Sequence, residues 1–325
     1  MIKNFAELID RLLQDPVKKK VAVVCAQDEH TLEAVIKAYK EKLISPVLIG
    51  EKEGIEAILK KEGADLSGAE IIDITDPSEC ARKACALARE GKVDAIMKGH
   101  LDTKTLMKVL VNKEDGISIS KVMNILAFME SPYYHKLFTL TDVGLLTYPT
   151  KEQKQMALEN AVRAYKALGE KNPKIAVLSA MEGVNSKLEQ TVEAAEIKKE
   201  GIKGAIVEGP ISLDLAMDKE ACAIKGYESP VAGDADILLV PDIVAGNLAA
   251  KSMTVLGGCK TGGVVVGGLV PVILVSRAAT VTDKYLAIVM AAMTSKKKIN
   301  QDSSITNLVS DEGHLETGFI TRKAN

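Results

Sequence analysis

The segment Gly262–Val275 reads GGVVVGGLVPVILV, is about 14 residues long, and ends abruptly at Ser276-Arg277. A membrane-spanning helix needs roughly 20 apolar residues, so this segment is too short to cross a bilayer. Its glycines and its proline interrupt any single long element, and we therefore expect a buried strand pair or a strand with a turn. An apolar strand that stops at a polar pair and precedes an alanine-rich helix is typical of α/β proteins.

The rest of the chain repeats this alternation of apolar runs and amphipathic stretches. The predicted strands are rich in valine, isoleucine and alanine, and comprise residues 20–26, 46–49, 93–97, 122–129, 137–141, 174–179, 205–207, 236–240, 263–266 and 272–275. The predicted helices comprise residues 5–13, 28–41, 52–62, 77–89, 102–111, 151–168, 186–199, 243–255 and 282–294. Strands without polar alternation fit a parallel sheet covered by helices on both faces. We therefore predict doubly wound α/β architecture.

The length of 325 residues favours two α/β domains with a cleft between them over one large domain. Residues 147–150 read TYPT, and Pro149 suits the first turn of a helix, which makes this stretch the candidate boundary. Residues 301–325 form a polar tail with little apolar periodicity.

The composition excludes several classes of function. The 42 basic and 44 acidic residues give a net charge of −2, which leaves no electrostatic footprint for nucleic acid. Aromatic residues make up only 3% and tryptophan is absent, which argues against sites that stack bases or sugars. The five cysteines are odd in number and form no CxxC, so we expect reduced thiols, a cytoplasmic location and no structural metal. The first 20 residues lack the features of a secretory signal, and we expect no association with membranes.

Several predicted strands end in lysine, glycine, proline, aspartate or serine. In open α/β sheets, ligands bind beyond the carboxyl ends of the strands, so these ends are candidate binding positions. Their alternative role is that of turn residues only. The ends are Lys98-Gly99-His100, Asp142-Val143-Gly144, Glu208-Gly209-Pro210, Pro241-Asp242 and Ser276-Arg277.

Arg277 stands out among the six arginines because it follows an apolar strand and precedes a predicted helix. Its planar guanidinium matches a phosphate, and the start of the helix adds unpaired N–H groups. Asp283 lies six residues further on. Thr280 and Asp283 also have the spacing of a capping box, so from the spacing alone Asp283 is either a helix cap or a catalytic base.

Ser276-Arg277 followed by Asp283 resembles the active-site segment of the phosphate acetyltransferase and phosphate butyryltransferase family. Further stretches agree with that family in order along the chain, and the opening of the chain is closest to the butyryl branch. They are Lys98-Gly99, Leu140-Thr141-Asp142-Val143, Gly209-Pro210 with Ser212-Leu213-Asp214, Val231-Ala232-Gly233-Asp234-Ala235-Asp236, Pro241-Asp242 and Ala245-Gly246-Asn247.

This resemblance implies a fold of the isocitrate/isopropylmalate dehydrogenase type, with two doubly wound α/β domains flanking a cleft. The first domain would comprise residues 1–147 plus 281–300, the second residues 148–280, and the protein would form a homodimer or higher homo-oligomer. The implied reaction moves a butyryl or acetyl group between CoA and orthophosphate by direct transfer in a ternary complex. Acyl-CoA, orthophosphate and acyl phosphate would be its only partners, with no cofactor and no metal.

The resemblance also implies roles for individual residues. Asp283 would be the base that takes the CoA thiol proton, Ser276 would hydrogen-bond the sulfur, and Arg277 would hold the phosphate or offset the oxyanion charge. The predicted substrate-binding residues in the stretches that match the family are Lys98, Gly99, Asp142, Asp214, Gly233, Asp242 and Asn247. Ser118, Ser120 and Asn124, in a stretch that departs from the family, are predicted to bind substrate as well.

The chain departs from the family where butyryltransferase-like sequences commonly carry Gly-Leu-Arg-Thr-Gly. Ser118 stands at the position of that arginine, and Asn124-Ile125 replaces a Ser-His pair. The departure leaves open an altered acyl or anion preference, a reduced activity, or a non-catalytic protein that binds acyl-CoA or acyl phosphate. A separate alternative is a dehydrogenase of the same fold that acts on a hydroxy acid. The dehydrogenase is disfavoured because no GxGxxG follows a first strand and no set of aspartates and histidines for a metal is evident.

Overall fold

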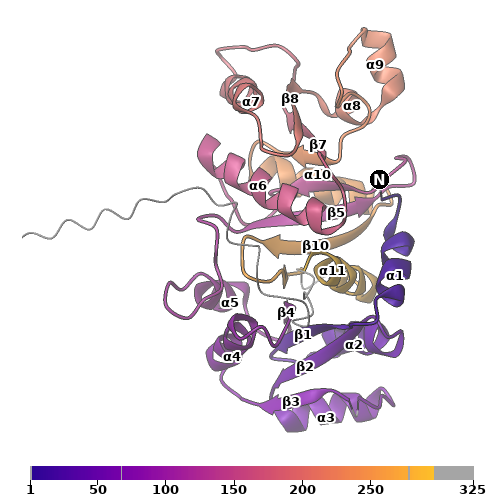
Figure 1. Cartoon of the computed structure of the whole chain (residues 1–325), viewed down its shortest axis with the longest axis vertical. Coiled ribbons are helices and arrows are strands. Elements are labelled where there is room, and N and C mark those ends of the chain that lie inside the picture. Colours follow the sequence, from indigo (N-terminus) through magenta and orange to yellow (C-terminus); the bar gives the residue numbers. More distant parts are fainter. Residues whose placement is uncertain (1, 67, 277–278, 296–325) are drawn as a thin grey trace, which may run out of the picture.

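A mixed sheet of 11 strands runs through the whole molecule in the computed structural model, which describes residues 2–66, 68–276 and 279–295 (Figure 1). Its strands lie in the order β3 (Glu70–Asp73), β2 (Ile44–Gly50), β1 (Lys19–Val24), β4 (Ala95–Lys98), β11 (Val272–Ile273), β10 (Lys260–Val266), β5 (Asn124–Glu130), β6 (Phe138–Thr141), β9 (Ile237–Leu239), β7 (Lys174–Leu178) and β8 (Ile206–Ile211).

The strands form two parallel sets that run in opposite directions. β3, β2, β1, β4 and β11 are parallel to one another, and so are β6, β9, β7 and β8. Between the sets, β10 is antiparallel to β11 and to β5, and β5 is antiparallel to β6. The carboxyl ends of the two sets therefore lie at opposite edges of the sheet. The expectation of a parallel sheet is wrong at the centre, because Gly267, with a φ of 98°, allows the chain to reverse between β10 and β11.

Helices cover both faces of the sheet and make three layers. One face carries α1 (Phe5–Gln14), α2 (Glu29–Lys40), α3 (Lys52–Lys61), α6 (Lys151–Ala167), α7 (Glu189–Glu200) and α11 (Val281–Thr294). The other carries α4 (Pro77–Arg89) and α5 (Thr103–Leu110) over the first set of strands, and α8 (Leu213–Met217), α9 (Lys219–Lys225) and α10 (Ile243–Val255) over the second. The α/β fold class predicted from the sequence is confirmed.

Alternation of apolar side chains along the strands explains why both faces need helices. In β1, Val21 and Val23 belong to the core under α2 and α11, whereas Ala22 and Val24 belong to the core under α4. All four side chains are fully buried. Because each apolar strand presents such residues to both faces, helices on one face alone would leave the opposite row in water.

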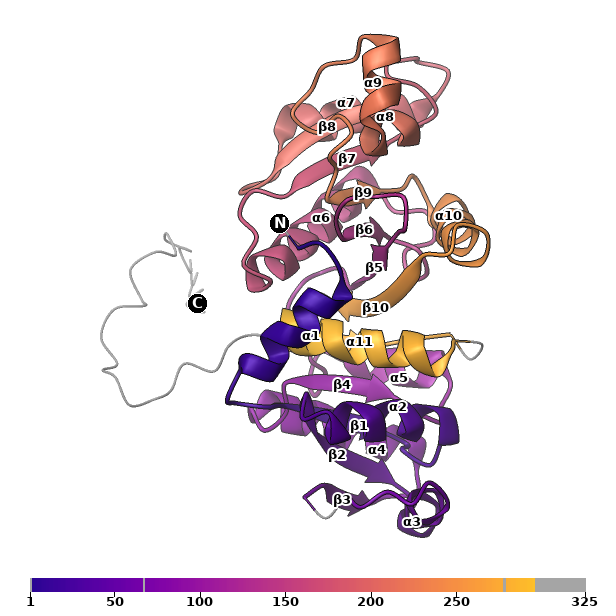
Figure 2. The same cartoon turned by 90° about the vertical axis from the view of Figure 1, so that its right-hand side faces the viewer.

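The last described helix returns to the first set of strands. α11 packs against α1, α2 and β10, and Figure 2 shows α1 and α11 crossing side by side over the sheet. Tyr285 to Ala292 are all buried, which fits this central position. α11 therefore completes the helical layer that begins with α1 on this face of the sheet.

Two neighbouring glycines of β10 differ in the space that α11 leaves for a side chain. A Cβ on Gly262 would lie 2.8 Å from the Leu286 carbonyl oxygen, whereas a Cβ on Gly263 would meet nothing within 4 Å. We expect Gly262→Ala to lower the free energy of unfolding by about 1–3 kcal/mol, because α11 has to shift. Gly263→Ala should leave it unchanged or raise it by about 0.5 kcal/mol, since the unfolded chain loses freedom. Urea unfolding of both variants measures the difference, and equal effects would contradict the packing described for α11.

Some local predictions differ from the structure. Residues 70–73 form β3, a short edge strand with exposed ends, which the apolar pattern did not reveal. Glu208-Gly209-Pro210 was expected beyond the end of a strand but lies inside β8, which continues to Ile211. The predicted domain boundary at residue 147 falls between β6 and α6, and the domain division stays a prediction. The predicted tail, residues 301–325, lies outside the described residues. Among the described helices, none is both long and apolar enough to cross a bilayer.

Candidate active site

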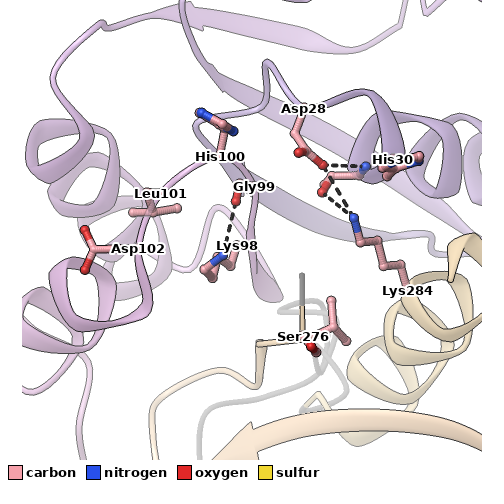
Figure 3. Close-up of a pocket in the computed structure, with 11 residues that line it drawn as sticks. Asp28, His30, Lys98, Gly99, His100, Leu101, Asp102, Ser276 and Lys284 are labelled. Carbon is pink, nitrogen blue, oxygen red and sulfur yellow. Dashed lines mark hydrogen bonds and ion pairs between the residues drawn. The ribbon is translucent and has the colours of Figure 1, made fainter. Parts of the chain in front are cut away.

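A cavity of about 530 Å³ opens at the carboxyl ends of β4 and β11. Lys98, Gly99 and Ser276, three residues predicted to bind substrate or act in catalysis, line it together. Figure 3 shows these residues with others from α2, α11 and the segment that leads into α5. The remaining lining residues are Asp28, His30, Thr31, His100, Leu101, Asp102, Val275 and Lys284. The structure thus brings three predicted site residues together in one cavity with others that the sequence analysis did not assign to the site.

Three helices begin at the rim of this cavity. Asp28 caps α2 by accepting from the Thr31 N–H at 2.7 Å, and Asp102 caps α5 by accepting from the Thr105 N–H at 2.8 Å. Thr280 caps α11. The positive ends of helices favour anions, and at α2 and α5 the carboxylates of Asp28 and Asp102 already take that position. Among the described residues, the positive charges that line the cavity are those of Lys98 and Lys284.

Gly99 brings the ends of β4 and β1 into close contact. Its N–H donates to the Val24 carbonyl at 2.8 Å, and a Cβ would lie 2.3 Å from the Cys25 carbonyl oxygen. No larger residue fits without moving the backbone. Cys25, next to this contact, has a left-handed φ of 52°. Burial raises the pKa of its thiol to about 12, so Cys25 stays protonated and is a poor nucleophile at neutral pH.

Lys284 is a nearly buried cation at the cavity wall. Its side chain is 6% exposed and extends from α11 toward Asp28 (Figure 3). Its Nζ lies 3.5 Å from Asp28 Oδ1 and 3.4 Å from Thr31 Oγ1. Burial acts to raise the pKa of Asp28, but hydrogen bonds from Thr31 and the charge of Lys284 outweigh it, so the pKa lies below its ordinary value. Asp28 is therefore a carboxylate at neutral pH.

Asp283, the predicted base, lies in the first turn of α11 directly before Lys284. Its Oδ2 accepts from the Thr280 N–H at 3.0 Å and from the Thr280 hydroxyl at 2.9 Å, and its own N–H donates to Thr280 Oγ1. The capping box that the spacing allowed is thus formed. The role of Asp283 as a base stays a prediction. Arg277, the predicted phosphate ligand, lies outside the described residues.

Four predicted substrate-binding residues lie at the opposite edge of the sheet, where β5 begins and the turn after β10 lies. Ser118 pairs with Gly268 in that turn, and its hydroxyl donates to the Ser120 carbonyl at 2.8 Å. Asn124 is fully buried and donates to Thr141 Oγ1. Asp142 is also buried and accepts from the N–H groups of Ile125, Gly144, Leu145 and Leu146. These contacts hold loops together.

The other predicted residues lie around the second set of strands. Asp242 caps α10 and lines a separate cavity of about 460 Å³ beside α6 and α7, and Asn247 donates to the Val143 carbonyl. Asp214 pairs with Lys225 at 2.9 Å, and hydrogen bonds from Ser212 and Lys225 lower its pKa to about 2. Gly233 has a φ of 62°, and a Cβ there would lie 2.7 Å from the Lys219 nitrogen. Their predicted contacts with substrate stay predictions.

The sequence contained signals for the cavity residues that were missed. Asp28 follows the first apolar strand, and Lys284 is the charged residue that precedes the apolar run Tyr285–Ala292. A lysine at the start of a helix that is otherwise buried needs either a partner or a ligand. Among the residues that the structure describes, no group of three or more His, Cys, Asp and Glu side chains is placed to hold a metal ion.

Comparisons with known proteins identify the family of the chain. The family described as Phosphate acetyl/butaryl transferase matches residues 79–292. A phosphate butyryltransferase of Clostridium acetobutylicum is 39% identical over 92% of this chain and 100% of its own. A phosphate acetyltransferase of Thermotoga maritima is 39% identical over 85% and 95%. The crystal structure of a branched-chain phosphotransacylase from Enterococcus faecalis has a TM-score of 0.76 at 33% identity, covering 85% of this chain and 98% of its own. A 4-hydroxythreonine-4-phosphate dehydrogenase from Burkholderia phymatum, 15% identical with a TM-score of 0.55 over 87% and 100%, shares the fold alone.

Proposed function

Because the chain belongs to the phosphate acetyl/butyryl transferase family, we propose that it is a phosphate acyltransferase that moves a short acyl group between CoA and orthophosphate. The observation that carries this proposal is the cavity beyond β4 and β11, where Lys98, Ser276 and Lys284 meet the starts of three helices. The two lysines suit a phosphate that must lie beside a thioester. Arg277, which follows Ser276 in the sequence, would add a bidentate phosphate ligand.

The reaction forms one bond and breaks another. An oxygen of hydrogen phosphate attacks the thioester carbonyl carbon, the C–S bond breaks, and the CoA thiolate takes up the proton that the hydrogen phosphate loses. In the reverse direction the thiol gives its proton to a base, for which we propose Asp283, while Ser276 hydrogen-bonds the sulfur. Holding both substrates in one cavity makes the transfer effectively unimolecular, so no covalent acyl-enzyme is needed. The protonated thiol of Cys25 is consistent with this direct transfer.

The proposed partners are acyl-CoA, orthophosphate and acyl phosphate, and the proposed reaction requires no further cofactor. We propose a homodimer, supported by the apolar face of α10, which leaves Val244, Leu248, Val255 and the adjoining Leu256 exposed at 51, 63, 79 and 85%. A cytoplasmic location is supported by the cysteines, all five of which are free thiols, four of them buried.

The test is phosphate-dependent release of CoA from butyryl-CoA, followed with a thiol reagent. We expect turnover with orthophosphate and with arsenate, which resembles it in charge and shape. A panel from acetyl-CoA to hexanoyl-CoA then identifies the preferred chain. A folded preparation that binds butyryl-CoA but releases no CoA with any chain would instead support the non-catalytic alternative.

A further inference from the structure

Lys284 is a buried cation with bonding capacity left over. A lysine ammonium has three N–H donors. The contacts of the Lys284 Nζ with Asp28 Oδ1, at 3.5 Å, and with Thr31 Oγ1, at 3.4 Å, are both long. Asp28 Oδ1 is already shared, since it accepts from the Thr31 N–H at 2.7 Å. The ion pair is therefore weaker than a direct contact near 2.8 Å would be.

Other buried lysines of the chain form ion pairs with shorter distances between nitrogen and carboxylate oxygen. Lys136, whose side chain is 3% exposed, lies 2.6 Å from Asp236 and 3.0 Å from Asp234. Lys154, 6% exposed, makes a short ion pair with Glu193. Lys284 is as buried as these but lines an open cavity, and its nearest carboxylate is about an ångström further away than Asp236 is from Lys136. Burying a charge is costly unless close partners compensate it, so its position favours an anionic ligand.

We propose that Lys284 binds the orthophosphate that attacks the thioester, and the same phosphoryl group in the acyl phosphate. This inference rests on the proposed function and assigns the cation that holds its second substrate. Asp28 is the positioning residue: it orients the ammonium when the site is empty and competes with phosphate for it. The proposal also bears on the arginine absent at Ser118. The Ser118–Gly268 bridge lies at the edge of the sheet opposite Ser276. Lys284 therefore supplies a cation in the cavity even though the arginine is absent at position 118.

The first test replaces Lys284 by methionine, which keeps the length of the side chain and removes its charge. We expect the KM for phosphate of Lys284→Met to rise about 10- to 100-fold, the effect of losing one charged contact, while the KM for butyryl-CoA stays within about threefold. Lys154→Met is the matched control, because it also removes a buried, paired lysine but lies in α6 beside the second cavity. Its KM for phosphate should not change.

The second test is Asp28→Asn, which separates phosphate binding from a structural role. Asparagine caps a helix as well as aspartate does, so α2 should form normally. If Lys284 binds phosphate, removing the competing carboxylate should lower the KM for phosphate about 3- to 10-fold, the opposite direction from Lys284→Met. If the pair only stabilises the fold, both variants should lose stability and neither should change the KM for phosphate selectively.

A binding measurement keeps the inference independent of turnover. Inorganic phosphate should raise the thermal midpoint of the wild-type protein, raise that of Asp28→Asn more at the same concentration, and raise that of Lys284→Met little. An unchanged response in Lys284→Met overturns the inference even if the wild type is an active transferase. A rise in the KM for butyryl-CoA alone would assign Lys284 to the phosphates of CoA and also overturn it. Absence of CoA release in the wild type would overturn the proposed function, while the thermal response to phosphate still tests Lys284.

Discussion

Asp283→Asn should lower kcat by about two to four orders of magnitude and leave thermal stability nearly unchanged. The carboxylate of Asp283 accepts two hydrogen bonds from Thr280, and an asparagine amide oxygen can accept both. The substitution therefore preserves the cap of α11 and removes only the base. Steady-state kinetics in both directions, together with a thermal melt, measure the two effects separately.

Asp283→Ala is the matched comparison, because it removes both the base and the carboxylate half of the capping box. We expect it to lose the same activity and, in addition, about 1 kcal/mol of stability. A variant Asp283→Asn with near-wild-type kcat would show that the residue is a helix cap alone. Such a result would return Asp283 to the first of the two roles that its spacing from Thr280 allowed.

Asp234→Asn should lower the free energy of unfolding by about 3 kcal/mol at pH 7. Asp234 lies 2.8 Å from His135, 3.0 Å from the buried Lys136 and 2.5 Å from Lys174. Asparagine cannot compensate the charges of Lys136 and Lys174, and Lys136 keeps Asp236 as its carboxylate partner. These contacts join the start of β9 to the β5–β6 connection and to β7. Urea unfolding measures the loss, and Asp10→Asn, at an exposed position of α1, is the control expected to have little effect.

The same substitution predicts a pH dependence. Burial acts to raise the pKa of Asp234, but hydrogen bonds from Lys174, Lys136 and His135 outweigh it, so the pKa lies well below that of the unfolded chain. A depressed pKa contributes stability that is present above the unfolded pKa of about 4 and is lost as the pH falls below it. The difference in the free energy of unfolding between the wild type and Asp234→Asn should therefore be largest at pH 7 and smaller at pH 3. A constant difference would show that charge is not its cause.

The family and the fold class could be predicted from the sequence because their signals are local. Ser276-Arg277 follows an apolar strand, and Asp283 lies only six residues after Arg277. Both signals can be recognised in the sequence without knowledge of the fold. The reversal of strand direction at the centre could not be predicted in the same way. Apolar strands such as β10 and β5 bury both faces whichever way they run, and their sequences carry no mark of direction.

The candidate site was only partly predictable because turns and ligand sites use the same residue types. Asp142 and Asn124 follow or begin strands as binding residues do, yet their polar atoms are occupied by other protein groups. The reversal of the sheet also separates strand ends that look equivalent in the sequence. Conversely, Asp28 and Lys284 meet only because α11 packs on α2, a contact between the two ends of the chain.

The return of α11 has a consequence for synthesis. Asp28 and Lys98 leave the ribosome early, whereas Ser276 and Lys284 are among the last described residues to be made. Contacts this far apart in sequence form slowly, because the long intervening chain must first be brought into order. A nascent chain therefore carries its first set of strands without β11 and α11, with the apolar faces of α1 and α2 uncovered. The cavity lined by Lys98, Ser276 and Lys284 forms only after α11 has been made, so a product that ends before α11 would lack it.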